Sequence, residues 1–282
     1  MKPAPFAYIR PETEAAALAA LAEHGDDAVV LAGGLSLGAM LNMRLVFAET
    51  VIDINRLQEL NHIEHEGYWI RTGALVRQAD AMASPKIAEA VPLLNKGLRN
   101  VGHYQTRSRG TLGGSVAHAD PSAEVPLCLA TLGGEVELAS QRGTRRIAAR
   151  EFAESALSTC READEMITAL YWPIRGNGAA AFSEITQRHG DFAIVATAAV
   201  ARREGSGFVF SLGFGGVEGC PRVLDGTAPA TDWDGYARDA VAEFVGSLDP
   251  MEDPRASAAY RGDVAVHLGV ETLLQALGEA AA

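Results

Sequence analysis

Short apolar runs and helical patterns alternate along the first part of the chain. Pro11-Glu12-Thr13-Glu14 followed by AAALAALAEHG (15–25) predicts a helix that ends at Gly25, a residue type that commonly terminates helices. Two apolar runs, DAVVLAGG at 27–34 and VIDI at 51–54, are too short for helices and predict strands, the first of them buried. Residues 37–45 predict either the start of a helix or an irregular segment.

Further short elements follow in the same manner. We expect a strand at 68–75, a helical region at 77–102 broken at its prolines, a compact helix or strand at 125–132, and a β-rich segment at 135–149 whose tip carries Gly143.

The pattern changes after Arg175-Gly176-Asn177-Gly178, which is the best candidate for a domain boundary. Beyond it we expect three strands at 180–186, 192–204 and 206–217, and two helices at 232–248 and 265–280. The sequence contains no repeat of 20–50 residues that would indicate a solenoid.

Composition narrows the class of protein. The 282 residues carry a formal net charge of −12, which argues against nucleic acid or an anionic membrane surface as a partner. No apolar run approaches the roughly 20 residues that span a bilayer, and the first residues lack the apolar core of a signal peptide. Cys128, Cys160 and Cys220 form no CxxC pair, which argues against a zinc ribbon or an iron–sulfur cluster in this chain. We therefore expect a cytoplasmic protein with reduced thiols.

Two glycine-rich loops have the same chemistry. AGGLS at 32–36 directly follows a predicted strand, and GTLGGS at 110–115 opens a small, polar stretch. Glycines let the backbone approach a ligand closely, and successive free N–H groups then form a concave site for anionic oxygens. Ser36, Thr111 and Ser115 add hydroxyl donors. Together the loops predict one extended diphosphate ligand, although each loop alone is more often a simple turn.

The familiar nucleotide-binding signatures are absent from the sequence. Residues 33–38 have the outer glycine spacing of a P-loop, but Ala39-Met40 stand where a Lys and a Ser or Thr are required. GFGGVEG at 213–219 fails the dinucleotide pattern because Glu218 occupies the third glycine position, and a turn or bulge explains it. An ordinary Rossmann domain is therefore not expected.

Three segments resemble the FAD-binding medium subunits of the molybdenum hydroxylases, the xanthine dehydrogenase and carbon monoxide dehydrogenase family. AGGLSLGAMLNMRL (32–45) resembles the first flavin loop of that family, and RGTLGGSVAHADPSAEVP (109–126) resembles the second. HGDFAIVATAA (189–199) resembles the segment that opens the C-terminal domain. The order and spacing match over nearly the whole chain, which makes the three motifs together far more specific than any one of them.

The resemblance implies which residues contact FAD. They are Ala32, Gly33, Gly34, Leu35, Ser36 and Leu37 in the first loop; Gly110, Thr111, Leu112, Gly113, Gly114, Ser115, Ala117 and His118 in the second; Val101, Gly102, Met166 and Ile167 along the flavin; Asp120 and Glu124 as hydrogen-bond acceptors; and Asp191 and Phe192 near the isoalloxazine ring. His118 is almost equally typical of a loop histidine bonded to backbone. The resemblance places no catalytic acid, base, nucleophile or metal ligand in this chain.

Two positions depart from the family pattern. Many relatives have a histidine at the position of Leu35, and many have a lysine near Ser183-Glu184. The second departure would remove a positive charge near the reduced flavin, and its effect on the flavin potential stays open.

The resemblance also implies the fold class, α/β followed by α+β. Residues 1–176 would form a two-subdomain FAD-binding domain of the vanillyl-alcohol-oxidase/PCMH-like type, with subdomains at about 1–55 and 56–176. Residues 177–282 would form a C-terminal α+β domain with a three-stranded sheet and helices.

The implied function is electron transfer. FAD in this chain would take electrons from the [2Fe–2S] clusters of a small subunit, which receives them from a large subunit with the molybdenum cofactor, and pass them to an external acceptor. A dimer of such heterotrimers is expected, with an N-heteroaromatic substrate favoured over carbon monoxide or an aldehyde. Two other classes stay open: a stand-alone NAD(P)H-dependent flavin reductase and a non-catalytic nucleotide-binding module.

Several other residues have plain structural explanations. His62 and His65 have a ligand-like spacing, but no third ligand accompanies them and a solvated turn is favoured. Arg99, Arg107 and Arg109 could steer an anionic cofactor, although pairing with acidic neighbours or a partner subunit is favoured. The arginines at 142, 145, 146 and 150 are expected on a solvated face of the predicted hairpin.

Overall fold

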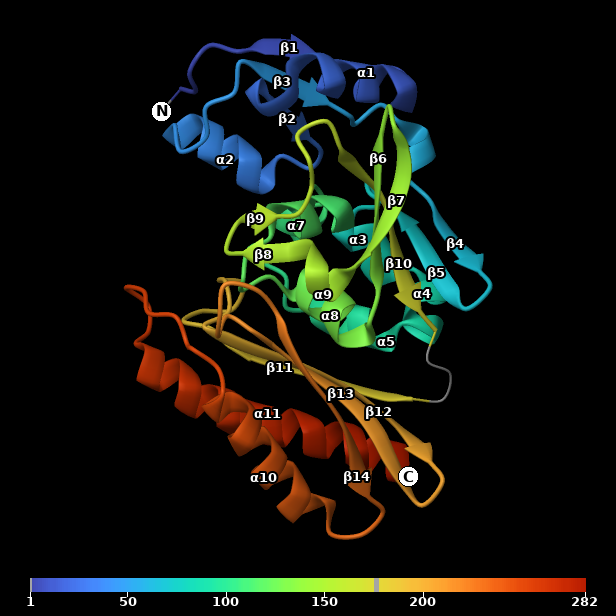
Figure 1. The fold of residues 1–282 in the computed structure, drawn as a ribbon, viewed down its shortest axis with the longest axis vertical. Coiled ribbons are helices and arrows are strands. Elements are labelled where there is room, and N and C mark those ends of the chain that lie inside the picture. The colour runs from blue at the N-terminus through green and yellow to red at the C-terminus, as the bar shows by residue number, and fades with distance from the viewer. Residues whose placement is uncertain (1, 175–177) are drawn as a thin grey trace.

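The computed structural model describes residues 2–174 and 178–282, and Figure 1 shows its sheets stacked along the long axis of the molecule. Of the predicted domain boundary, Arg175, Gly176 and Asn177 lie outside the described residues. Within the described ranges, no helix is both long enough and apolar enough to cross a membrane.

The first sheet is parallel, with the strand order β1-β3-β2. Its elements are β1 (Ala7–Ile9), α1 (Glu14–His24), β2 (Ala28–Leu31), α2 (Leu35–Met43) and β3 (Thr50–Asp53). Thr13 caps α1, because its side-chain oxygen accepts a hydrogen bond from the Ala16 N–H at 3.2 Å. α1 then packs Leu18 and Leu21 into one core with Ile52 of the central strand. The predicted helix and both predicted strands are confirmed, and residues 37–43 of the ambiguous segment belong to α2.

The second sheet is antiparallel, with the strand order β4-β5-β10-β6-β7. Its strands are β4 (Ile63–Glu66), β5 (Trp69–Gly73), β6 (Glu135–Ser140), β7 (Gly143–Ala148) and β10 (Met166–Pro173). β10 lies in the middle and is buried along its length up to Trp172. The indole N–H of Trp172 donates to the hydroxyl of Thr72 at 3.0 Å, so the polar group of this buried ring is satisfied.

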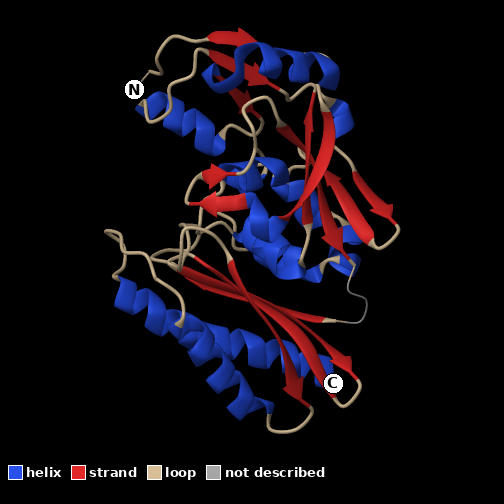
Figure 2. Cartoon of the chain, viewed as in Figure 1, coloured by secondary structure: helices blue, strands red, loops and turns tan. Residues whose placement is uncertain are grey.

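Helices fill the space between the second and third sheets (Figure 2). Along the chain they are α3 (Gln78–Ala83), α4 (Pro85–Ala90), α5 (Pro92–Leu98), α6 (Tyr104–Arg107), α7 (Leu112–His118), α8 (Glu124–Leu132) and α9 (Ala149–Phe152), followed by the small pair β8 (Ala153–Ser155) and β9 (Ser158–Thr159). The predicted breaks are confirmed, since Pro85 and Pro92 each begin a helix, where the missing N–H costs no hydrogen bond. The apolar run at 125–132 is helical and wholly buried.

The third sheet has four strands, β11 (Ala179–Ile185), β12 (Val195–Glu204), β13 (Gly207–Gly215) and β14 (Arg222–Pro229), paired antiparallel in sequence order. The expectation of a three-stranded sheet is therefore wrong. β14 escaped prediction because RVLDGTAP is mostly exposed and contains the strand-disfavouring Asp225, Gly226 and Pro229. The two predicted helices are confirmed as α10 (Trp233–Gly246) and α11 (Ala258–Ala281), and α11 packs on β11 and β12.

β12 joins the two largest cores of the molecule. Its Ala196, Ala198 and Val200 belong to the core that contains α5 and α8, whereas Val195 and Ala199 belong to the core under α10 and α11. Burial on both faces explains why this strand is a continuous apolar run rather than an alternating one. The third sheet is thus packed against α8. Phe192 lies in the segment directly before β12.

Candidate functional site

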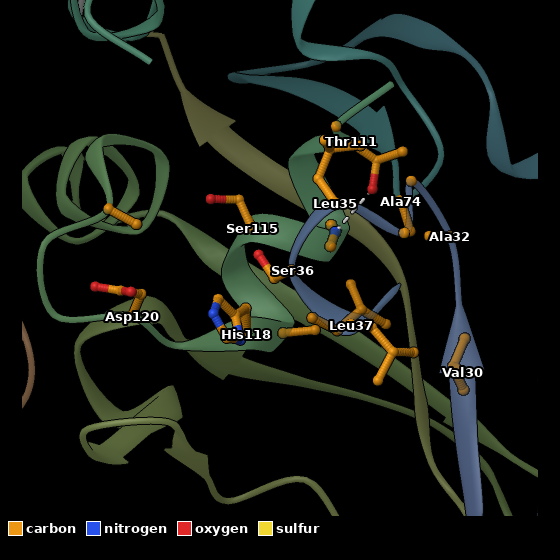
Figure 3. A pocket seen from close by; sticks show the side chains of 18 of the residues that line it. Val30, Ala32, Leu35, Ser36, Leu37, Ala74, Thr111, Ser115, His118 and Asp120 are labelled. Carbon is orange, nitrogen blue, oxygen red and sulfur yellow. Dashed lines mark hydrogen bonds between the residues drawn. The ribbon is translucent and has the colours of Figure 1, made fainter. Parts of the chain in front are cut away.

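A cavity of about 330 Å³ lies where the first sheet meets α7 and β10. Figure 3 shows side chains of this cavity from β2, α2 and α7, with Ser36, Ser115 and Asp120 among them. Both glycine-rich loops line it, although they lie about 80 residues apart in the sequence. The structure thus brings the two predicted loops together at one cavity.

The first loop supplies the free amides of the site. Gly34 adopts φ 76°, a left-handed conformation that glycine tolerates without strain, and it caps the N-terminus of α2. The N–H groups of Leu35, Ser36 and Leu37 lie in the first turn, where a helix offers them no acceptor. These amides and the partial positive charge of the helix end favour an anionic oxygen.

The second loop differs from the prediction of a nest of free N–H groups, which is wrong for its helical half. The Leu112 N–H donates to the Val76 carbonyl at 2.9 Å, and the Gly113 N–H donates to the Ala74 carbonyl at 3.1 Å. The Gly114 N–H donates to the Thr111 hydroxyl at 3.0 Å, the bond drawn dashed in Figure 3. This loop therefore contributes a small, flat surface and the Ser115 hydroxyl rather than backbone donors.

The two loops touch at Gly33. A Cβ atom on Gly33 would lie 2.4 Å from the carbonyl oxygen of Arg109 and 3.0 Å from the Cα of Gly110. Both contacts are to backbone, which cannot rotate away as a flexible side chain could. Only glycine at position 33 therefore allows the two loops to approach this closely.

Almost all of the predicted site residues line the cavity. The exceptions are Gly102, Leu112 and Asp191. Leu112, the first residue of α7, is fully buried, because its side chain packs into the hydrophobic core rather than into the cavity. Asp191 is exposed, although its neighbour Phe192 does reach the cavity.

The cavity also contains residues that sequence reasoning missed. They include Val29, Val30, Met40, Ala74, Gln78, Thr106, Arg161 and Glu165. Gln78 is the most informative of these, because it is 5% exposed and its Oε1 has no hydrogen-bond partner among the described residues. A buried, unpaired carbonyl oxygen is costly, so its position in the cavity wall fits a ligand that donates a hydrogen bond.

Two carboxyl groups in this part of the molecule, those of Glu124 and Glu184, have raised pKa values. Burial raises the pKa of Glu124, a cavity residue at the start of α8, to about 8, and the charges of Glu184 and Asp120 raise it too. Burial also raises the pKa of Glu184 on β11 to about 7. Glu184 is thus a half-buried carboxyl group whose charge acts on a second carboxyl group, that of Glu124.

Arg161 and Glu165 form a charged wall of the cavity. Arg161 donates to the carbonyl of Glu165 at 2.8 Å, and burial lowers the pKa of its guanidinium. The carboxylate of Glu165 accepts two hydrogen bonds from Arg145 at 2.6 and 2.7 Å, which hold its pKa below the ordinary value. The charge of Glu165 is thus paired with Arg145, whereas the Arg161 guanidinium donates to backbone carbonyls.

The remaining sequence candidates have structural roles. His62 bonds to the Glu59 carbonyl at 2.8 Å and contacts Arg71, and no group of three or more metal-ligating side chains occurs in the described part of the chain. Arg107 donates to the carbonyls of Val101 and Gly102 at 2.8 and 3.0 Å, so it shapes the loop between α5 and α6.

The fold and the cavity together define a protein that holds one elongated, anionic cofactor between a small parallel sheet and a larger antiparallel sheet. Residues 4–175 match the family described as the FAD binding domain in molybdopterin dehydrogenase. The chain therefore belongs to this family, FAD is its cofactor, and its class is oxidoreductase.

Relatives match the chain over nearly its full length. It is 35% identical to the 6-hydroxypseudooxynicotine dehydrogenase complex subunit alpha of Paenarthrobacter nicotinovorans, over 99% of this chain and 97% of the relative. It is 33% identical to the carbon monoxide dehydrogenase medium chain of Afipia carboxidovorans, over 94% of both chains. The solved structure of quinoline 2-oxidoreductase from Pseudomonas putida 86 matches with a TM-score of 0.92 and 31% identity, over 100% of both chains. The resemblance to medium subunits of molybdenum hydroxylases is thus confirmed.

Proposed function

We propose that this chain is the FAD-carrying electron-transfer subunit of a cytoplasmic, three-subunit molybdenum hydroxylase. Its FAD would accept electrons from the [2Fe–2S] clusters of a small subunit and deliver them to an external acceptor. The large subunit would hold the molybdenum cofactor and the substrate, and two such heterotrimers would associate. The observation that carries the proposal is the cavity between the two glycine loops, in a chain similar to named medium chains over 94% of its length.

The residues present fit FAD. The first-turn N–H groups of α2 and the hydroxyls of Ser36 and Ser115 would bind its diphosphate. The amide of Gln78 and the carboxyl groups of Asp120 and Glu124 would pair with polar groups elsewhere on the cofactor. FAD, when bound, supplies the redox chemistry, while these side chains bind it, orient it and exclude water around it. As part of the same proposal, the FAD-binding domain would end at residue 176 and would divide into two subdomains near residue 55.

For the whole complex we propose an N-heteroaromatic substrate. Two of the three proteins reported above are named for compounds with a nitrogen-containing ring, 6-hydroxypseudooxynicotine and quinoline. The third is named for carbon monoxide. Carbon monoxide or an aldehyde is the second candidate, because the substrate pocket would lie on another chain.

Cofactor attachment gives a first test. The loops suit a diphosphate and place no His or Cys for covalent attachment, so acid precipitation of the yellow chain should release FAD into the supernatant. Thin-layer chromatography and absorbance identify and quantify the released flavin. FMN in the supernatant, or flavin that stays in the pellet, would contradict this prediction.

Assembly gives a second test. Purification through a tag on this chain, co-expressed with its two partner subunits, should yield a complex that contains molybdenum and iron and reduces a dye when an N-heterocycle is added. The chain expressed alone should bind FAD and show no substrate-dependent dye reduction. Native mass spectrometry gives the stoichiometry. A chain that alone reduces dyes from NADH at high turnover would instead support the stand-alone reductase.

A further inference from the structure

Two side chains behind the cavity connect its two loops. The Asn55 amide group donates to the carbonyl of Ala32 in the first loop at 2.7 Å. Arg77 donates from Nη1 to the carbonyl of Arg109, directly before the second loop, at 2.5 Å. Arg77 also donates from Nη2 to Oδ1 of Asn55 at 2.6 Å, which closes the connection. A continuous chain of charge-assisted and neutral hydrogen bonds thus runs from one loop to the other.

The connection acts at the point where the loops meet. The Arg109 carbonyl that Arg77 holds is the same atom that a Cβ on Gly33 would approach to 2.4 Å. The main chain beside Arg77 is fixed as well, because the Gln78 N–H donates to the Gly110 carbonyl and the Leu112 N–H donates to the Val76 carbonyl, both at 2.9 Å. The main chain next to Arg77 is therefore bonded to the second loop, and the Arg77 side chain reaches toward the first loop through Asn55.

Asn55 is itself held from the first sheet. Its side-chain amide donates to Oδ1 of Asp53 at 2.6 Å, and its backbone N–H donates to the same oxygen at 2.9 Å. The other oxygen of Asp53 accepts a hydrogen bond from the Tyr8 hydroxyl. Although burial alone would raise it, the hydrogen bonds from Tyr8 and Asn55 and the charge of Arg10 hold the pKa of Asp53 below its ordinary value. The carboxylate stays ionised and fixes the amide of Asn55.

Neither Asn55 nor Arg77 lines the cavity. We propose that Asn55 and Arg77 are positioning residues, which hold the two loops at a fixed separation so that the first turn of α2 is ready to receive the diphosphate. This inference rests on the proposed FAD site. Binding to a preformed site avoids the cost of ordering two loops at the moment of association, so loss of the connection weakens binding without removing any contact to the cofactor.

The planar guanidinium is required because two acceptors diverge from one side chain. Its two Nη atoms bond Asn55 and the Arg109 carbonyl at the same time, a fork geometry that a lysine ammonium does not reproduce. A lysine keeps the charge and one of the two bonds. Arg77→Lys and Arg77→Met therefore separate the role of the fork from the role of the charge.

The test measures FAD affinity by fluorescence titration of the flavin-free full chain. Arg77→Met should raise the dissociation constant about 10- to 100-fold, and Arg77→Lys by an intermediate factor. Arg99→Met is the matched control, because it removes an equally charged, exposed arginine whose side chain bonds only Asn95, at 3.3 Å, among the described residues; it should leave the constant unchanged. Asn55→Ala should raise the dissociation constant about as much as Arg77→Met. The double variant should bind FAD no more weakly than the weaker-binding single variant, since both substitutions break the same connection.

Two further measurements separate positioning from general stability. Amide hydrogen exchange of residues 32–38 in the flavin-free chain should accelerate in Arg77→Met, with the thermal midpoint almost unchanged. A lower midpoint with unchanged FAD affinity would overturn the inference, and so would an equal loss of affinity in Arg99→Met. Failure of the wild-type chain to bind FAD would instead overturn the proposed function.

Discussion

Gly33→Ala should abolish FAD binding in a chain that still folds. The added methyl group would lie 2.4 Å from the Arg109 carbonyl oxygen and 3.0 Å from the Gly110 Cα, so the two loops must separate to admit it. Separation moves the first turn of α2 away from Ser115 and breaks the site for the diphosphate. We expect purified Gly33→Ala to contain almost no flavin and to bind added FAD at least 100-fold more weakly. Absorbance at 450 nm against protein, and titration of the flavin-free chain, measure the two effects.

Gly38→Ala is the matched control for this prediction. Gly38 lies on α2, the helix that begins directly after Gly33-Gly34, and a Cβ there has nothing within 4 Å. Alanine is also the better helix former by about 1 kcal/mol, so this variant should be as stable as the wild type or slightly more stable. It should retain full flavin content. If Gly33→Ala kept its flavin, or Gly38→Ala lost it equally, the contact between the loops would not control cofactor binding.

The sequence predicted the location of the site better than its internal chemistry. Gly33 and Gly34 follow a strand, and Gly113 and Gly114 belong to a small, polar stretch. Each pair alone is typical of a turn, and only the two loops together indicated a ligand. Which amides are free depends on hydrogen bonds to distant segments, such as that between Leu112 and Val76. No local pattern encodes that pairing, and the predicted nest in the second loop was wrong for this reason.

Residues whose role depends on contacts between distant segments could likewise not be predicted from the sequence. Gln78 begins a helix in a segment with no glycine or motif, and its unpaired Oε1 becomes informative only once the cavity wall is known. Arg161 and Glu165 precede β10 in an unremarkable polar stretch. In contrast, apolar periodicity located α1, α10 and α11 correctly, because helices of eleven or more residues with a buried face leave a repeated signal.

The departure at Ser183-Glu184 has a structural consequence. Phe182 packs beside Gly97 of α5 and Cys128 of α8, and Glu184 lies two residues further along the same strand, on the same face. Glu124 lies one helical turn before Cys128 on α8, so the two carboxyl groups face each other across this interface. One oxygen of Glu184 has no hydrogen-bond partner among the described residues. Asp120 is the other charged group that acts on Glu124, and it has the same sign.

Glu184→Gln should therefore stabilise the chain at alkaline pH and leave it almost unchanged at acidic pH. The folded-state pKa of Glu184, about 7, is above the ordinary glutamate pKa of 4.5, so between these pH values the folded chain keeps a proton that the unfolded chain releases. The stability that this proton provides is fully present below pH 4.5 and is lost as the pH rises through about 7. Glutamine has no proton to lose. We expect the free energies of unfolding to coincide near pH 4.5 and to differ by about 2 kcal/mol at pH 8, at about 1.4 kcal/mol per pKa unit with a reduction for partial exposure.

The measurement is urea denaturation of the flavin-free chain at several pH values, which keeps cofactor binding out of the comparison. Glu23→Gln, which removes an exposed carboxyl group on α1, is the control and should follow the wild-type pH dependence. Glu124→Gln should act in the same direction, since burial raises the pKa of Glu124 to about 8. A parallel pH dependence in the wild type and Glu184→Gln would show that this carboxyl group is ionised in the folded chain at neutral pH, with a counter-charge supplied from elsewhere.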